Sequence, residues 1–253
     1  VRSARDVKEL HSLIKKQWNK KNGAAHKVIT KVEKAEALVD LVAIIKETDG
    51  IMVARGDLGV ETPATDVPIH QKNMIALCRE AGKPVIVATE MLGSMVSRPR
   101  PTRAEVSDVA NAVIDHTDAV MLSGESASGD FPVEAVAMMG AIARETEASV
   151  LDDVEVCALP DTSKKTSRGA GVLAGILAER GDVQAILVTP DSLDFLSQMA
   201  FFRPHVPVIA GAVNPRDARI GQLYWGTYFV TPVTGTPMFI THLKKSARHL
   251  GLA

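Results

Sequence analysis

The sequence predicts an α/β protein in which parallel strands alternate with helices. Short apolar runs rich in β-branched residues recur between longer segments whose apolar residues lie three and four positions apart. The run Ile51–Ala54 is apolar on both faces, which is typical of a parallel strand covered by helices. Glycine and proline separate several of these segments, as expected at turns.

After an initial helix, four strand-then-helix units follow one another. The expected helices are Ser3–Lys20, Glu36–Thr48, Asp66–Ala81, Thr102–His116 and Pro132–Ala148. The expected strands are Lys27–Glu33, the strand and turn Gly50–Gly59, Pro84–Thr89 and Ala119–Leu122. A complete (β/α)8 TIM barrel takes about 250 residues. We therefore expect half of such a barrel, with a four-stranded open sheet as the alternative.

The composition changes near Val150, where an acidic segment rich in Pro, Ser, Thr and Lys begins. We expect a partial barrel domain at 1–151, a linker at 152–166 and a smaller, incomplete α/β domain with an open sheet at 167–253. The helices expected there are Ala170–Glu179, Leu193–Phe202, Pro215–Tyr224 and Pro237–Leu250. The strands expected there are Ala185–Thr189, Val206–Ala210 and Tyr228–Thr231.

The overall composition excludes some classes of partner. A net charge of −1 gives no electrostatic argument for binding nucleic acid or a membrane surface. No apolar run approaches the ~20 residues of a spanning helix. Cys78 and Cys157 lack metal-type spacing and indicate reduced thiols. We expect a cytoplasmic protein.

The segment Lys27–Glu33 places charged side chains near the end of a strand. Because strand side chains alternate between two faces, Ile29, Lys31 and Glu33 share one face. An edge strand with a solvated face is one interpretation. A central strand whose charged face opens onto a site fits better, because a helical pattern follows at once.

Asp57 lies between Gly56 and Gly59, directly after a predicted buried strand. We expect the two glycines to turn the backbone sharply and to let it approach a ligand. Asp57 would then present a carboxylate at the carboxyl edge of a parallel sheet, where α/β proteins place their chemistry. The alternative is an ordinary strand that ends in an Asp-Gly turn.

Five motifs in this order resemble the pyruvate kinase family. They are Ile29–Glu33, Asp49–Gly59, Lys83–Leu92, Arg98–Glu105 and Met121–Ser126. The resemblance is close up to about Ser149, and it implies the second half of the catalytic TIM barrel followed by most of a C-terminal domain. Glu90 departs from the family, which commonly has Gln there. We expect its side chain to face away from that of Thr89.

The resemblance implies Mg²⁺-dependent transfer of a phosphoryl group from phosphoenolpyruvate to ADP, giving pyruvate and ATP. It implies that Lys31 and Thr89 are catalytic and that Lys31, Gly56, Asp57 and Thr89 contact the substrate. Glu33 and Asp57 would bind the metal, Mg²⁺ or Mn²⁺, which accepts carboxylate and substrate oxygens. The Lys31 charge would stabilise the phosphoryl group and the enolate.

The resemblance also implies a homotetramer and a possible K⁺ ion, whose ligands we expect in an N-terminal half beyond this chain. No nucleotide-binding residues are expected in this portion, so we do not expect the 253 residues alone to work as a kinase. Two alternatives stay open. One is an enolate-forming lyase of the phosphoenolpyruvate/pyruvate type, and the other is a truncated, inactive chain with a structural or regulatory role.

Overall fold

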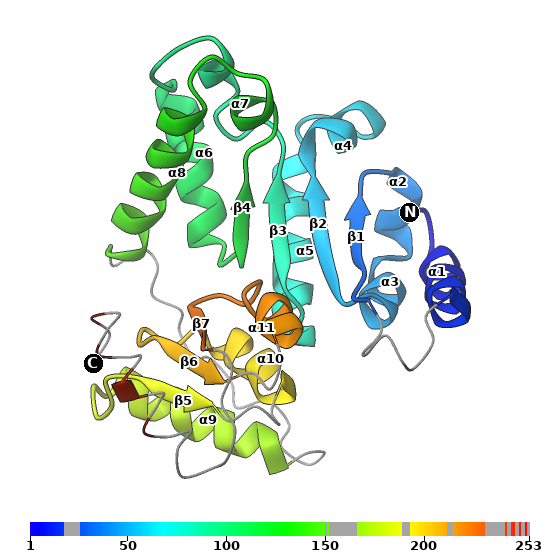
Figure 1. Cartoon of the computed structure of the whole chain (residues 1–253). Coiled ribbons are helices and arrows are strands. Elements are labelled where there is room, and N and C mark those ends of the chain that lie inside the picture. The colour runs from blue at the N-terminus through cyan, green and yellow to red at the C-terminus, as the bar shows by residue number, and fades with distance from the viewer. Residues whose placement is uncertain are drawn as a thin grey trace. The chain divides into compact units, whose positions relative to one another are not determined.

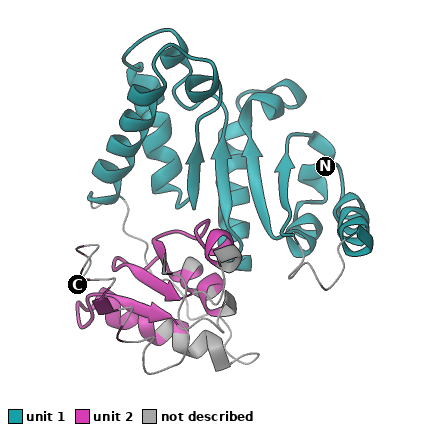
Figure 2. Ribbon diagram, in the orientation of Figure 1, with its two compact units in different colours: residues 1–153 teal, residues 154–253 magenta. Residues whose placement is uncertain are grey.

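A computed structural model describes residues 1–17, 26–149, 151, 166–188, 193–211 and 215–230, with single positions beyond 240. The chain divides into two compact units, 1–153 and 154–253 (Figure 2). The predicted linker, up to residue 165, lies outside the described residues, as does most of the predicted helix Pro237–Leu250. The predicted domain boundaries stay a prediction.

The first unit contains a four-stranded parallel sheet in the order β1-β2-β3-β4. Its strands are β1 (Ile29–Val32), β2 (Gly50–Ala54), β3 (Val85–Ala88) and β4 (Ala119–Met121). Its longer helices are α1 (Ala4–Gln17), α5 (Val67–Ala81), α6 (Arg103–Ile114) and α8 (Pro132–Glu147). Figure 1 shows that the strands end at one edge, where the short helices α4 (Arg55–Glu61) and α7 (Gly124–Ala127) also lie. The predicted alternation of parallel strands and helices is confirmed.

The core of this unit explains why its strands are apolar on both faces. All four residues of β3 are buried, as are four of the five residues of β2. Val53 and Val87 belong to one hydrophobic cluster with residues of the surrounding helices, including Ile44 and Met74. The buried central strands therefore support the residues at their carboxyl ends.

The predicted helix Glu36–Thr48 is wrong in one respect, because the structure has two helices there. These are α2 (Ala35–Val39) and α3 (Leu41–Glu47). The break is at Asp40, whose carboxylate accepts a hydrogen bond at 2.7 Å from the backbone N–H of Ala4, the first residue of α1. Asp40 thus satisfies a helix-end donor 36 residues away.

The glycine turn predicted at Gly56 and Gly59 is also wrong. Both residues lie within helix α4, and neither has a positive φ. The backbone leaves the extended conformation at Ala54 (φ −96°, ψ 83°), and the helix begins on the next residue, Arg55. Asp57 is consequently in the first turn of a helix.

The helix end expected at Ala81 and the helix start expected at Thr102 are confirmed. Gly82 has a left-handed backbone (φ 63°) and ends α5. Thr102 begins α6 with a capping box, in which its side chain and that of Glu105 each accept a backbone hydrogen bond from the other.

The second unit contains a three-stranded parallel sheet in the order β5-β6-β7. Its strands are β5 (Ile186–Val188), β6 (Val208–Gly211) and β7 (Thr227–Val230). Its helices are α9 (Thr166–Glu179), α10 (Leu193–Phe202) and α11 (Pro215–Gly221). The predicted open-sheet α/β fold is confirmed, although α9 begins four residues earlier than expected. Among the helices described in either unit, none has the length and hydropathy needed to cross a membrane.

Candidate active site

Three predicted site residues meet at the carboxyl edge of the sheet in the first unit. The Lys31 Nζ atom lies 2.6 Å from Glu33 Oε2 and 2.7 Å from Asp57 Oδ2. The predicted strand periodicity places Lys31 there, because Thr30 and Val32 point into the core while Lys31 is exposed. One ammonium group thus bridges carboxylates that come from two neighbouring strand ends.

The bridge shifts the pKa values of Lys31 and Asp57 in the directions that favour their charged forms. Hydrogen bonds with Asp57 and then with Glu33 raise the pKa of Lys31 above its ordinary value. The same hydrogen bond from Lys31 holds the pKa of Asp57 below its ordinary value. About half of each of these two side chains is exposed, and exposed ion pairs contribute little to stability. The cluster is therefore a minor source of fold stability.

Glu33 and Asp57 have the chemistry of a divalent-cation site. Both carboxylates reach one cation, the Lys31 ammonium, at hydrogen-bond distance. Within the part of the chain that the structure describes, no group of three or more His, Cys, Asp or Glu side chains could hold a metal. Two carboxylates completed by substrate and water oxygens are an arrangement that Mg²⁺ typically accepts. The donor set thus fits Mg²⁺.

Thr89 follows the end of β3 with an unusual backbone. Its φ is 69°, which is uncommon for any residue with a side chain and a genuine outlier for a β-branched one. Its Oγ1 accepts a hydrogen bond from the Gly56 N–H at 2.8 Å and donates one to the Ala88 carbonyl at 2.6 Å. The structure thus brings Thr89 and Gly56, two predicted substrate contacts, into direct contact.

The expectation that Glu90 faces away from Thr89 is wrong. A Cβ atom added at Gly56 would lie 3.5 Å from Thr89 Oγ1 and 3.6 Å from Glu90 Oε1. Both side chains therefore approach the same face of Gly56. The physical reason is the backbone of Glu90, whose φ of 54° ends the alternation of an extended strand.

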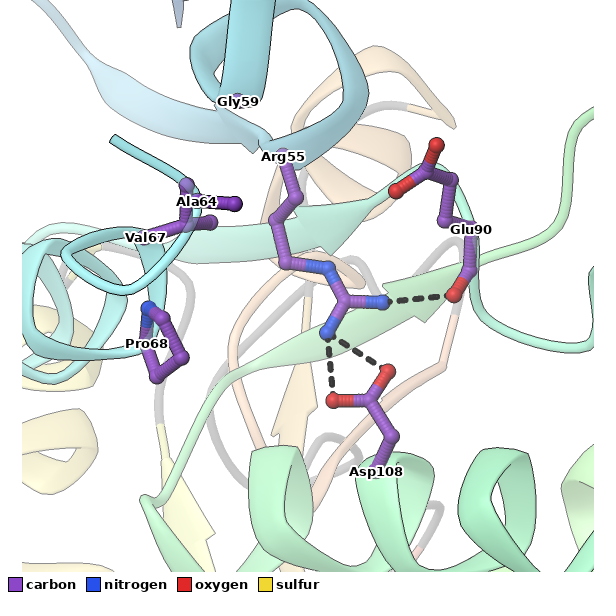
Figure 3. A pocket seen from close by; sticks show the side chains of 7 residues that line it. All are labelled: Arg55, Gly59, Ala64, Val67, Pro68, Glu90 and Asp108. Atoms are coloured by element: carbon purple, nitrogen blue, oxygen red, sulfur yellow. Dashed lines mark hydrogen bonds and ion pairs between the residues drawn. The ribbon is translucent and has the colours of Figure 1, made fainter. Parts of the chain in front are cut away.

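Arg55, the residue before Gly56, lines a cavity of about 240 Å³ (Figure 3). The cavity is also lined by Gly59, Ala64, Val67, Pro68, Glu90 and Asp108. The guanidinium Nη1 donates a hydrogen bond to Asp108 Oδ1 at 2.7 Å and forms an ion pair with Asp108 Oδ2 at the same distance. Arg55 is thus the structural charge partner of Asp108. No local pattern could have identified Asp108, because it lies 53 residues away.

A second cavity of about 260 Å³ adjoins the first and shares four of its lining residues. The shared residues are Arg55, Val67, Pro68 and Asp108. On its other side lie Lys72 and Asp115, which form an ion pair. The charges that line this second cavity are therefore paired with one another.

A parallel sheet with charged side chains at its carboxyl edge is typical of α/β enzymes, the β/α barrels among them. Residues 1–136 match the family described as the pyruvate kinase barrel domain. The chain belongs to the pyruvate kinase family.

Individual relatives agree with this assignment. A pyruvate kinase from Sporosarcina psychrophila is 43% identical over 240 residues, which cover 93% of this chain and 39% of that protein. Pyruvate kinase 2 of Synechocystis is 45% identical over 89% of this chain and 37% of its own length. A crystal structure of a pyruvate kinase from Cryptosporidium parvum matches all of this chain with a TM-score of 0.88 and 32% identity, over 52% of that chain. The chain thus spans about two fifths of the length of these two sequence relatives.

Proposed function

We propose that this protein transfers the phosphoryl group of phosphoenolpyruvate to ADP, giving pyruvate and ATP. The observation that carries the proposal is the cluster of Lys31, Glu33 and Asp57 at the carboxyl edge of the sheet. Phosphoryl transfer is catalysed mainly by positioning and by stabilising charge. A lysine and two carboxylates at the ends of rigid strands supply both.

Each residue of the proposed site has a distinct task. Lys31 presents a compact positive charge to the transferred phosphoryl group and to the enolate oxygen. About half of its side chain is exposed, so a substrate can reach the ammonium group from solvent. The N–H groups of Gly56 and Asp57, in the first turn of α4, would bind the substrate carboxylate, and the Gly56 N–H would then exchange its hydrogen bond with Thr89 Oγ1 for one with the substrate. The Thr89 hydroxyl donates a hydrogen bond to the substrate or passes a proton.

Glu33 and Asp57 are the proposed ligands of Mg²⁺ or Mn²⁺. The support for this assignment is that both carboxylates lie within 2.7 Å of the same positive group, the Lys31 ammonium. When bound, the metal would neutralise oxygens of the phosphate and carboxylate of the substrate. Family membership implies a metal cofactor in general, and the choice of these two ligands is our proposal.

Membership of the family also supports proposals that concern the whole protein. We infer a homotetramer in the cytoplasm that uses K⁺ in addition to the divalent ion. The K⁺ and nucleotide ligands would lie in the part of the family's length that this chain does not cover.

The test is an assay of the protein expressed from its complete coding sequence. With phosphoenolpyruvate, ADP and Mg²⁺ we expect pyruvate and ATP to form in equal amounts, and we expect EDTA to abolish both. Pyruvate and inorganic phosphate formed at the same rate without ADP would contradict a kinase, because water and not ADP would then accept the phosphoryl group. No turnover of phosphoenolpyruvate in the presence of ADP would favour the enolate-forming lyase.

A further inference from the structure

The segment Thr89–Leu92 follows β3 in a conformation that its own sequence does not favour. Thr89 and Glu90 are consecutive residues with side chains, and both have positive φ (69° and 54°). Such a backbone persists only where the surrounding structure imposes it, and such positions cluster at functional sites. The groups that bind this segment therefore decide where the Thr89 hydroxyl lies.

Arg55 binds the carbonyl groups of this segment. Its Nη2 donates to the Thr89 carbonyl at 2.9 Å and to the Glu90 carbonyl at 3.0 Å (Figure 3), and it contacts Met91 Sδ at 2.9 Å. Its Nε lies 3.3 Å from the same Thr89 carbonyl. The residue is only 8% exposed, and the Asp108 carboxylate orients the guanidinium from the other side.

Glu125 binds the end of the same segment from a different element. It lies in α7, beyond the end of β4, and is 3% exposed. Its Oε1 accepts a hydrogen bond from the Leu92 N–H at 3.0 Å, and its Oε2 accepts one from the Ser123 N–H at 2.8 Å. A buried carboxylate is costly unless it is hydrogen-bonded. The buried carboxyl group of Glu125 thus connects the end of the Thr89–Leu92 segment to the residue before α7.

We propose that Arg55 and Glu125 are positioning residues that hold the segment Thr89–Leu92, with its left-handed residues Thr89 and Glu90, and thereby aim the Thr89 hydroxyl at Gly56. Arg55 binds carbonyls at the start of the segment, and Glu125 binds the amide at its end. Neither acts on the substrate directly. The inference rests on the proposed function only in that Thr89 is taken to contact the substrate.

The test uses Glu125→Gln and Arg55→Lys in the protein expressed from its complete coding sequence. Glu125→Gln keeps the shape of the side chain and one hydrogen-bond acceptor. Arg55→Lys keeps the positive charge but loses the planar guanidinium, which donates several hydrogen bonds at once. A small misplacement of a catalytic group lowers the reaction rate strongly. Each change should therefore lower kcat roughly 10- to 100-fold with a smaller effect on KM. Glu134→Gln, an exposed acid on α8, is the matched control and should leave kcat unchanged.

A double-mutant cycle separates positioning from general damage to the fold. Glu125→Gln should lower kcat less than about twofold in a Thr89→Ala background, because the group it positions is then absent. Equal effects in both backgrounds would overturn the proposal. If Glu125→Gln does not fold, the same cycle with Arg55→Lys decides the question.

Hydrogen exchange gives a readout that does not depend on activity. The Gly56 N–H donates to Thr89 Oγ1, so either positioning variant should speed exchange in the peptide that contains Gly56. Unchanged exchange would overturn the proposal. If the unmodified protein lacked kinase activity, the proposed function would fail, but the exchange measurement would still test the positioning of Thr89.

Discussion

Lys31 touches the proposed metal ligands without being one itself, and this separates its role from theirs. We predict that Lys31→Met lowers turnover at least ~10²-fold, because one preorganised charge stabiliser is lost. Metal affinity should stay the same or rise, since both carboxylates lose a competing cation. Titration with Mn²⁺ and steady-state rates measure the two effects separately.

Asp57→Asn and Glu33→Gln test the two proposed metal ligands. Each should weaken Mn²⁺ binding and lower turnover with little change in unfolding free energy, because exposed ion pairs contribute little to stability. A Lys31→Met protein with near-normal turnover would contradict the role proposed for the lysine.

Cys78 is a buried thiol in the hydrophobic core of the first unit. Burial raises its pKa from the ordinary value of 9.0 to about 12. We predict that iodoacetamide at pH 8 leaves Cys78 unmodified in the native protein, because only roughly 10⁻⁴ of it is thiolate, and modifies it after denaturation. Peptide mass spectrometry that follows Cys78 and Cys157 separately measures this. Rapid native labelling of Cys78 would show that the core opens.

The same pKa shift predicts a pH dependence of stability. Because the pKa of Cys78 is raised in the folded state, the contribution of this thiol to the free energy of unfolding is fully present below pH 9. That contribution is lost as pH rises toward 12. Cys78→Ala should therefore unfold with a shallower dependence on pH in this range, as followed by urea titrations at several pH values. An identical pH dependence in both proteins would argue against the shift.

Among the elements, helix α6 depends on its capping box for a defined start. Thr102→Ala should lower the unfolding free energy by about 1 kcal/mol, the usual cost of losing such a cap. Ser107→Ala, at an exposed position of the same helix, is the control. Urea denaturation followed by circular dichroism measures the difference, and equal midpoints for the two variants would contradict the assignment.

At the start of α6, the Glu105 carboxylate also accepts hydrogen bonds from Ser94. Burial opposes its charge, but hydrogen bonds from Ser94 and Thr102 outweigh burial and hold its pKa below the ordinary value of 4.5. Its stabilising contribution is therefore present above pH 4.5 and is lost as pH falls below that value. We predict that Glu105→Gln is less stable than the unmodified protein at pH 7 and that the difference shrinks by pH 3.

At the scale of the molecule, the described sheet of the first unit has β1 and β4 at its edges. Unpaired strand edges invite pairing with other chains. The chain covers about two fifths of the length of its relatives. We therefore predict that these 253 residues alone associate with one another and do not transfer a phosphoryl group to ADP. Light scattering and the kinase assay test this. A monodisperse, active monomer would refute it.

Local patterns in the sequence determined most of the architecture and the composition of the candidate site. The two-residue period of Lys27–Glu33 predicted that Lys31 and Glu33 lie on one face, and the buried run before Asp57 predicted its place at the same edge. Caps at Gly82 and Thr102 were also predictable, because such ends depend on a few adjacent residues.

The tertiary structure decided the features that depend on contacts between distant residues. Asp40 breaks a helix where its carboxylate binds Ala4, and Arg55 pairs with Asp108, 53 residues away. Glu90 faces Gly56 because its backbone is left-handed, next to carbonyls that a buried arginine binds. Periodicity describes only regular backbone, so a strained turn stabilised by remote charges leaves no local signal.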